Sequence, residues 1–229
     1  MALIEAERAD GTATGRRSAA RLATEAVGNF VLVFAFGVAI STHSWFSPLL
    51  IGAPLVAMIC SSSRVLGGHY TPAVTIAMLI RRRLAVRTAL AFWLVQFGAG
   101  LLAAASVSAI VDPRQLTITA DMTLKGSTLL AAFALELVLT CALCCVALEV
   151  STGDSRTVAG YNGWPFTLSV IACAIAIGAI AIGALDPAVG FDDAVHGISS
   201  SPTFWVYLVS QLLSGIAASI TFLSLGSHR

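Results

Sequence analysis

Six apolar stretches, each long enough to cross a lipid bilayer, constrain the fold of this chain more than any other feature. A membrane-spanning helix needs about 20 mostly apolar residues, and the stretches cover residues 22–40, 49–66, 88–111, 129–148, 166–185 and 204–225. Hydrophobic residues make up 57% of the 229 residues and charged residues only 11%, whereas soluble domains are about 25% charged. The sequence therefore predicts an all-α integral membrane protein in contact with the lipid bilayer.

Two shorter apolar segments, residues 72–80 and 187–195, cannot cross a bilayer because a helix rises only about 1.5 Å per residue. Both segments begin with the dipeptide Pro-Ala, which follows Thr71 in the first segment and Asp186 in the second. Proline is favoured at the first position of a helix, and Thr or Asp is favoured just before it as the N-cap. We expect two short re-entrant half-helices.

The half-helices and two glutamates divide the chain into similar halves. Glu25 and Glu136 each lie near the start of the span that opens a half, and the halves cover about 22–111 and 129–225. Each half has three spans, and because three is an odd number the second half is inverted relative to the first. Inverted repeats with interrupted short segments are typical of a binding site or pore at the middle of the membrane.

The basic residues are distributed unevenly around the predicted spans. If the N-terminus is cytoplasmic, eleven of the thirteen Lys and Arg residues lie on the cytoplasmic side, and only Arg114 and Lys125 lie outside. This distribution follows the positive-inside rule. We expect residues 1–21 and 226–229 to be cytoplasmic tails. The arginine run 81–83 is interpreted as a topology anchor, with lipid or partner binding as the alternative.

Other classes of protein are not supported by the residues. Cys141, Cys144 and Cys145 share one helix face, but no further thiol or His pattern completes a four-ligand metal site, so we interpret them as packing residues. The few polar residues inside the spans cannot form a nucleophile–base pair. A net charge of +1 provides no basic surface for nucleic acid. We expect no enzyme, cofactor, metal or nucleic-acid partner.

Residues 67–75, Gly-Gly-His-Tyr-Thr-Pro-Ala-Val-Thr, resemble the first signature of the aquaporin and glycerol-facilitator family of major intrinsic proteins. That signature is usually Gly-Gly-His-x-Asn-Pro-Ala-Val-Thr, and the second one, Asn-Pro-Ala-Arg, is matched by Asp-Pro-Ala-Val at 186–189. The similarity covers one channel domain, about 22–225, and extends to Gln96, Thr140 and the Trp-Val-Tyr run at 205–207. It implies six transmembrane helices plus two re-entrant half-helices in an inverted repeat.

The resemblance also implies a homotetramer with one pore per subunit in the plasma membrane. The chain has twelve Arg residues but only one Lys, and it is rich in Ala. This composition is compatible with a bacterial source. Two half-helix N-termini that face each other would place partial positive charge on the pore axis and repel cations. The predicted pore motifs are Thr71, Pro72, Ala73, Asp186, Pro187 and Ala188.

The resemblance further implies roles for residues around the motifs. In the family, glutamates of the first and fourth spans hold the re-entrant loops through backbone donors, which assigns loop anchoring to Glu25 and Glu136. Direct proton or ion transport by these carboxylates is the alternative. His69 is expected to be a loop anchor that is hydrogen-bonded to backbone.

Departures from the family pattern concern the pore itself. Counting from the motifs, the narrow outer constriction falls at Ile51, Ala174, Gly183 and Val189. Val189 replaces the family arginine, and Thr71 and Asp186 replace the family asparagines. The missing arginine and the small or aliphatic side chains at the four constriction positions predict a wide, apolar filter.

We expect a passive channel for small uncharged solutes, similar to glycerol or urea, and for water. An ionised Asp186 beside the pore would instead favour a cation- or proton-leaky pore, although Asp186 also has a simple interpretation as an N-cap. The third alternative is a non-conducting structural member of the same fold, because both asparagines and the arginine are missing.

Overall fold

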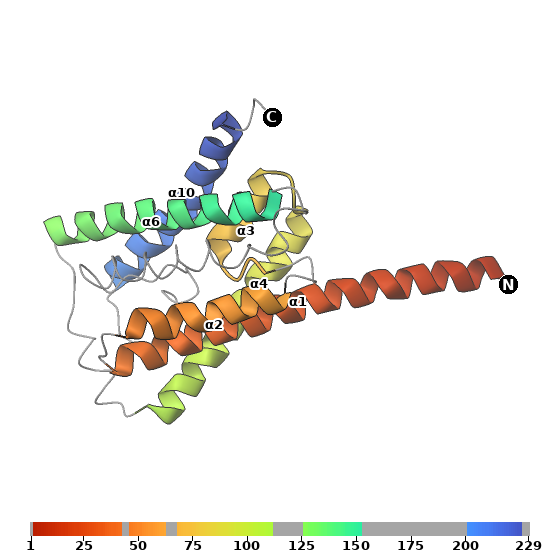
Figure 1. Cartoon of the computed structure of the whole chain (residues 1–229), viewed down its shortest axis with the longest axis horizontal. Coiled ribbons are helices and arrows are strands. Elements are labelled where there is room, and N and C mark those ends of the chain that lie inside the picture. Colours follow the sequence, from red (N-terminus) through yellow and green to blue (C-terminus); the bar gives the residue numbers. More distant parts are fainter. Residues whose placement is uncertain (1, 43–45, 63–67, 112–125, 153–200, 226–229) are drawn as a thin grey trace.

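The computed structural model describes residues 2–42, 46–62, 68–111, 126–152 and 201–225, and these residues contain helices but no strand. Figure 1 shows how the helices are arranged. They are α1 (Ala2–Thr42), α2 (Ser47–Ser62), α3 (Pro72–Ile80), α4 (Val86–Ile110), α6 (Ser127–Thr152) and α10 (Ser201–Leu225).

The helices agree with the predicted segments wherever the two can be compared. Helix α3 occupies the predicted half-span 72–80, and the predicted spans 49–66, 88–111, 129–148 and 204–225 overlap α2, α4, α6 and α10. Stretches in α1 and α4, Arg17–Ala39 and Val86–Ile110, are long and apolar enough to cross a membrane. The predicted span 166–185 and the second half-helix, 187–195, lie outside the described residues.

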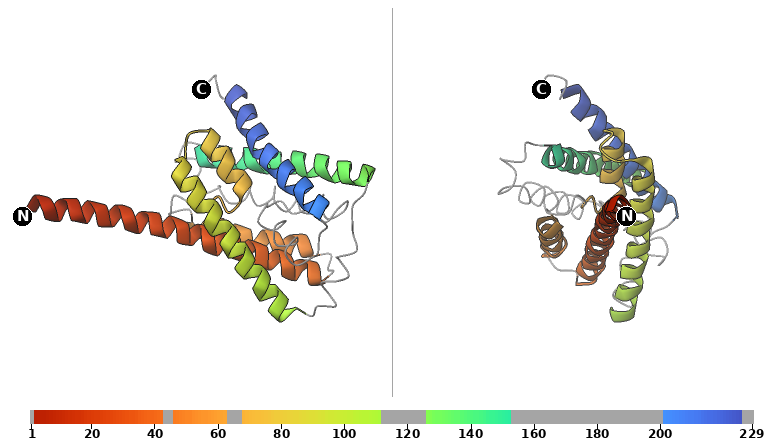
Figure 2. Two further views of the ribbon diagram at one scale, coloured as in Figure 1. Left: turned by 180° about the vertical axis from the view of Figure 1, so that it is seen from behind. Right: turned by 90° about the vertical axis from the view of Figure 1, so that its right-hand side faces the viewer.

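Helix α1 is longer than a bilayer requires. It has 41 residues, and residues 2–21, which the sequence assigns to a tail, belong to the same helix as the first span. Figures 1 and 2 show this first part of α1 extending beyond the other helices at one end of the molecule. The apolar pattern therefore locates the membrane part of α1 but not the start of the helix.

Helix α3 lies between the two halves of the chain. It packs against α4 of the first half and against α6 and α10 of the second. Gly215 of α10 allows this close approach, because a Cβ at that position would overlap the side chain of Ile76 and the carbonyl oxygen of Ala73. The hydroxyl of Ser219 donates to the Ala77 carbonyl at 3.1 Å, which joins α10 to α3 by a hydrogen bond.

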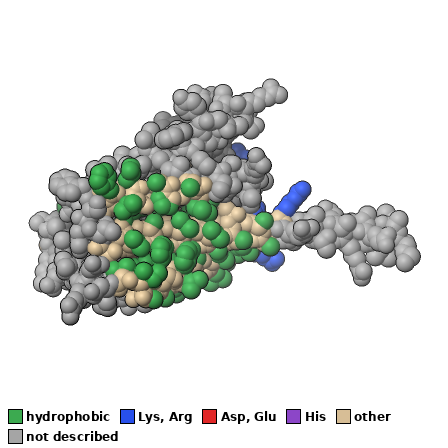
Figure 3. Space-filling model, turned by 60° about the horizontal axis from the view of Figure 1, so that its bottom comes forward, with side chains coloured by type: hydrophobic (Ala, Val, Ile, Leu, Met, Phe, Trp, Pro, Cys, Tyr) green, Lys and Arg blue, Asp and Glu red, His purple; other side chains and the backbone are tan. Residues whose placement is uncertain are grey.

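The interior contains many buried polar side chains, and the surface exposes many large apolar ones. Buried polar side chains lie inside the bundle, at Glu25, Asn29, Thr75, Gln96, Glu136, Thr140, Ser210, Gln211, Ser214 and Ser219. Large apolar side chains on α4 are exposed, for example Leu94 at 77%. Figure 3 shows apolar side chains covering the described part of one face. Such a face is suited to lipid and would be unfavourable in water.

Candidate functional site

Helix α3 begins at a capped N-terminus. Thr71 is the N-cap, with extended backbone, and its Oγ1 accepts a hydrogen bond from the backbone N–H of Val74 at 3.1 Å. Pro72 follows at the first helical position, where its missing N–H costs nothing. A hydroxyl carries one hydrogen and two lone pairs. The capping bond uses a lone pair, so the hydroxyl hydrogen of Thr71 remains available to a different partner.

The loop that leads into α3 is bound by a single carboxylate. Glu25 Oε1 accepts the backbone N–H groups of Gly68 and His69, and Oε2 accepts that of Tyr70, all at 2.8 Å. Gln96 Nε2 donates to Oε2 at 2.9 Å. Glu25 is fully buried, and a buried carboxylate is tolerated only when donors surround it. These four donors come from the loop and from α4, so Glu25 joins three segments.

Tyr70 turns the chain immediately before the cap. Its φ of 55° lies in the left-handed region, which is uncommon for a residue other than glycine. Asn29 Nδ2 donates to the Tyr70 carbonyl at 2.7 Å, and the phenolic hydroxyl donates to the Met58 carbonyl at 3.0 Å. A Cβ added to Gly28 would overlap the Tyr70 ring. Helix α1 therefore provides both the amide that holds this turn and the space for the ring.

The ring of His69 contacts side chains, while the backbone N–H of His69 is the group that binds Glu25. Nδ1 of His69 lies 3.4 Å from the hydroxyl of Thr75, which also accepts from Gln96 Nε2 at 3.3 Å. The edge of the His69 ring packs on Phe92, with centroids 5.3 Å apart. The guanidinium of Arg21 lies over the same Phe92 ring.

The second half contains a matching carboxylate–amide pair. Gln211 Nε2 of α10 donates to Glu136 Oε1 of α6 at 2.6 Å, as Gln96 of α4 donates to Glu25 of α1 in the first half. The paired residues are separated by 75 positions in the second half and by 71 in the first. The inverted repeat thus extends to individual side chains.

Three polar atoms beside this second pair have no hydrogen-bond partner in the part of the chain that is described. They are Glu136 Oε2, Gln211 Oε1 and the hydroxyl of Thr140, and all three residues are buried. Thr140 lies four residues after Glu136, as Asn29 lies four residues after Glu25. In the first half, the carboxylate of Glu25 and the amide of Asn29 bind the loop that precedes the half-helix, whereas Gln96 Oε1, like Gln211 Oε1, has no hydrogen-bond partner among the described residues.

Most of the remaining predicted site residues lie outside the part of the chain that the structure describes. Ile51 lies on α2, half-buried, and packs against the hydrophobic cluster that includes Tyr70 and Ala73. The other predicted pore and filter positions lie outside the described residues, namely Ala174, Gly183, Asp186, Pro187, Ala188 and Val189.

The three cysteines of α6 pack into the protein interior. Cys144 is buried, and Cys141 and Cys145 are half-buried against the same hydrophobic cluster. Across the described ranges, no group of three or more His, Cys, Asp or Glu side chains could hold a metal ion.

Several residues of the site escape the sequence analysis. Gln211 could have been found from its spacing to Glu136, which nearly equals the spacing of Gln96 from Glu25. Asn29 could have been suspected as a polar residue inside an apolar span. The roles of Gly28 and of the Tyr70 hydroxyl have no sequence signal, because they depend on how α1 and α2 pack.

A family model and several known proteins match the sequence of this chain. The family model described as Major intrinsic protein matches residues 12–222. The "Glycerol uptake facilitator protein-like 6" of Lactiplantibacillus plantarum is 30% identical over 89% of this chain and 97% of its own length. Nodulin-26 of Glycine max is 26% identical over 86% of this chain and 74% of its own length.

The fold is similar to that of a solved channel structure. The aquaglyceroporin from Plasmodium falciparum superposes with a TM-score of 0.73 at 18% identity, covering 92% of this chain and 98% of that one. This likeness confirms the predicted all-α fold of six transmembrane helices and two re-entrant half-helices. The chain belongs to the major intrinsic protein family, whose members are membrane channels for water and small solutes such as glycerol.

Proposed function

We propose that this protein is a passive channel for small uncharged solutes of the size of glycerol or urea, and for water. The observation that carries the proposal is the arrangement around Thr71. Glu25 binds the three consecutive amides of Gly68, His69 and Tyr70. Among the described residues, no donor bonds the carbonyl oxygens of Gly68 and His69. Two acceptors and the Thr71 hydroxyl hydrogen are therefore available to a neutral, hydrogen-bonding solute.

The irregular backbone at residues 68–71 supports a pore at this place. Backbone without regular secondary structure is tolerated at membrane depth only where it is buried in protein or lines a water-filled cavity. The N-terminus of α3 adds partial positive charge beside this backbone. That charge disfavours cations and has little effect on neutral solutes.

A second anchor completes the proposal. We assign Glu136 to the second re-entrant loop, which precedes Asp186, in the role that Glu25 has at the first loop. The bond between Glu136 and Gln211 and the unpaired Glu136 Oε2 support this assignment. His69 anchors the first loop through its backbone N–H. Cation leak remains the alternative that the carboxyl of Asp186 motivates.

The outer filter in this proposal is wide and apolar and consists of Ile51, Ala174, Gly183 and Val189. The side chains of this filter are small or aliphatic and none is positive. The filter is therefore wide enough for solutes larger than water. The printed names of the relatives, a glycerol uptake facilitator-like protein and an aquaglyceroporin, support the same solute class.

The proposed setting is a bacterial plasma membrane, with both termini in the cytoplasm and four subunits per assembly. The arginines support the topology, because Arg21 near the start of the membrane part of α1 lies over α4, and Arg81 at the end of α3 lies over Phe222 near the end of α10. The ends of α1, α3 and α4 that carry arginines therefore lie on the same side as the end of α10 near Phe222. Native mass spectrometry in mild detergents tests the assembly, and monomer under all conditions contradicts it.

Stopped-flow light scattering on proteoliposomes tests conduction. Wild type should pass glycerol and urea well above protein-free vesicles. Thr71→Val removes the hydroxyl without changing the side-chain size and should reduce glycerol flux, whereas the matched control Thr71→Ser keeps a hydroxyl and should retain it. Wild-type flux at the level of empty vesicles would favour a non-conducting protein. Fast water flux with exclusion of glycerol and urea would contradict the wide filter.

A further inference from the structure

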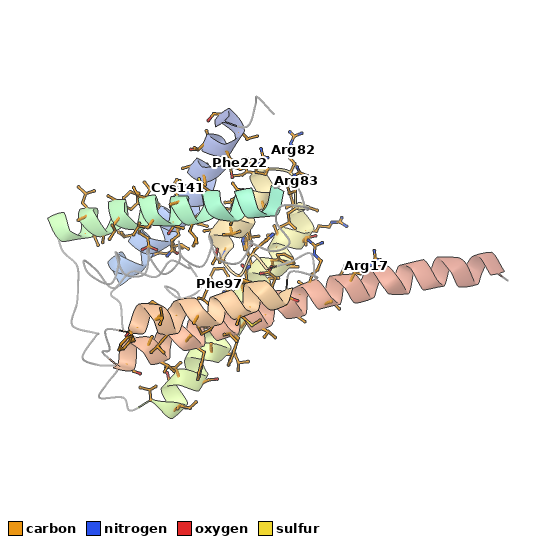
Figure 4. The ribbon with its side chains drawn as sticks, in the orientation of Figure 1. Arg17, Arg82, Arg83, Phe97, Cys141 and Phe222 are labelled. Carbon is orange, nitrogen blue, oxygen red and sulfur yellow. The ribbon has the colours of Figure 1, made fainter. Side chains whose placement is uncertain are left out.

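Three exposed arginines lie within six consecutive residues at the turn between α3 and α4. Arg82 and Arg83 follow the end of α3, and Arg87 lies in the first turn of α4. No carboxylate pairs with any of them within the residues that the structure describes. Arg81, their neighbour, instead lies over the Phe222 ring, with its guanidinium carbon 4.4 Å from the ring centroid. Figure 4 shows Arg82 and Arg83 side by side at this turn.

The backbone conformation at Arg82 favours glycine over arginine, although the C-terminal end of α3 attracts a positive charge. The N–H of Arg82 donates to the Leu79 carbonyl at 2.9 Å, and that of Arg83 donates to the Met78 carbonyl at 3.0 Å. This is the Schellman pattern of a helix C-terminus, in which the residue at the Arg82 position is left-handed and is usually glycine. Arg82 has a φ of 56°. An L side chain at this φ is strained relative to glycine.

Arg87 is also unfavourable by local criteria. It lies in the first turn of α4, where the partial positive charge of the helix N-terminus repels a cation. Arg82 thus has a backbone conformation that favours glycine, and Arg87 lies at a helix end that disfavours a cation. An anion outside the chain would account for both of them.

The surface of α4 that begins beside Arg87 is apolar and exposed. Val86, Leu90 and Leu94 follow one another at four-residue intervals along one face of α4, with exposures of 61%, 51% and 77%. Residues at this spacing share a helix face. In Figure 3, the apolar face ends at Lys and Arg side chains at one end of the molecule. Arginines next to such an apolar stripe are placed to reach lipid headgroups in a membrane.

We propose that Arg82, Arg83 and Arg87 bind the phosphate of an anionic phospholipid whose acyl chains lie along Val86, Leu90 and Leu94. The charge of the headgroup complements three cations, and the apolar stripe of α4 accommodates the chains. The proposal requires the membrane setting but is independent of which solute is conducted.

The test compares full-length protein in nanodiscs of phosphatidylcholine with protein in nanodiscs that contain phosphatidylglycerol. Phosphatidylglycerol should raise the thermal unfolding midpoint of wild type, and native mass spectrometry should show retained phosphatidylglycerol. The triple variant R82Q/R83Q/R87Q should lose most of this shift, with lipid binding weaker by about fivefold for each arginine removed. Arg17→Gln, an exposed arginine on α1, is the matched control and should keep the shift.

A second variant distinguishes loss of binding from loss of folding. Arg82→Gly relieves the left-handed backbone, so it should raise the unfolding midpoint in phosphatidylcholine while reducing the additional shift from phosphatidylglycerol. Equal midpoints of wild type in both lipids, or a full shift in R82Q/R83Q/R87Q, would overturn the proposal. So would the same shift from inorganic phosphate in phosphatidylcholine nanodiscs, because it would identify a free-anion site.

Discussion

Glu136 and Gln211 are joined by a 2.6 Å hydrogen bond between two buried side chains on different helices. The bond repeats, in the second half of the chain, the one between Glu25 and Gln96. Both pairs hold a carboxyl group inside the bundle through an amide from another helix. The two halves therefore share a buried hydrogen-bonded pair of side chains as well as the order of their helices.

Replacing Gln211 with Leu should destabilise the protein. The change removes a donor from a buried carboxyl group, and a buried acceptor left without its partner costs on the order of 1–3 kcal/mol. Thermal unfolding in detergent measures the effect. Leu213→Ala, at a partly exposed position on the same helix, is the matched control and should change the midpoint much less. Equal midpoints for Gln211→Leu and wild type would contradict a stabilising role for this bond.

Replacing Glu25 with Gln should reduce solute flux more than it reduces the amount of folded protein. The Gln side chain has one acceptor oxygen and an amide that donates, so it cannot accept from all of Gly68, His69, Tyr70 and Gln96. The loop before Thr71 should then shift. Glycerol flux per folded protein in proteoliposomes is the measurement. Flux equal to that of wild type would show that the loop keeps its shape without the carboxylate.

Gly28→Ala should be strongly destabilising, and the effect should depend on Tyr70. A methyl group at position 28 overlaps the Tyr70 ring, so the cost should shrink when Tyr70 is also changed to Ala, as in a double-mutant cycle for two side chains in contact. Gly98→Ala is the matched control, because no atom lies within 4 Å of its added Cβ. That change should stabilise the helix by about 0.5–1 kcal/mol. Additive effects of Gly28→Ala and Tyr70→Ala in unfolding experiments would rule out the contact.

Asp186→Asn should test whether the second motif carries charge into the pore. If Asp186 is ionised, the change removes a negative charge beside the positive helix ends, and any proton or potassium leak should fall while neutral-solute flux is kept. The half-helix should tolerate the change, because Asn and Asp are nearly equal as N-caps. Proton and potassium leak in liposomes is measured beside glycerol flux. Wild type without leak, together with unchanged fluxes in the variant, would leave Asp186 as a cap alone.

Val189→Arg should narrow the filter and add a positive charge. Glycerol flux should fall more than water flux, because the larger solute is more sensitive to pore width. The same light-scattering assay compares the two fluxes. An equal reduction of both would place position 189 outside the constriction.

The sequence by itself determined the features that depend on neighbouring residues and on bilayer thickness. Helix α3 was predicted over 72–80 and extends over Pro72–Ile80, because a capping Thr and a first-turn Pro act within one helical turn. The apolar stretches located the membrane parts of the helices, since their length is set by the bilayer. The start of α1 at Ala2 was not predicted, because the polar residues before the first span carry no membrane signal.

Only the tertiary structure decided which distant side chains meet. Gln211 contacts Glu136 across 75 residues, and the Tyr70 hydroxyl reaches the Met58 carbonyl on α2. Gly28 matters only because α1 passes against the Tyr70 ring. These contacts follow from the angles at which the helices cross and from the side chains that fill the space between them. Helix packing involves many residues at once, so no local pattern in the sequence encodes it.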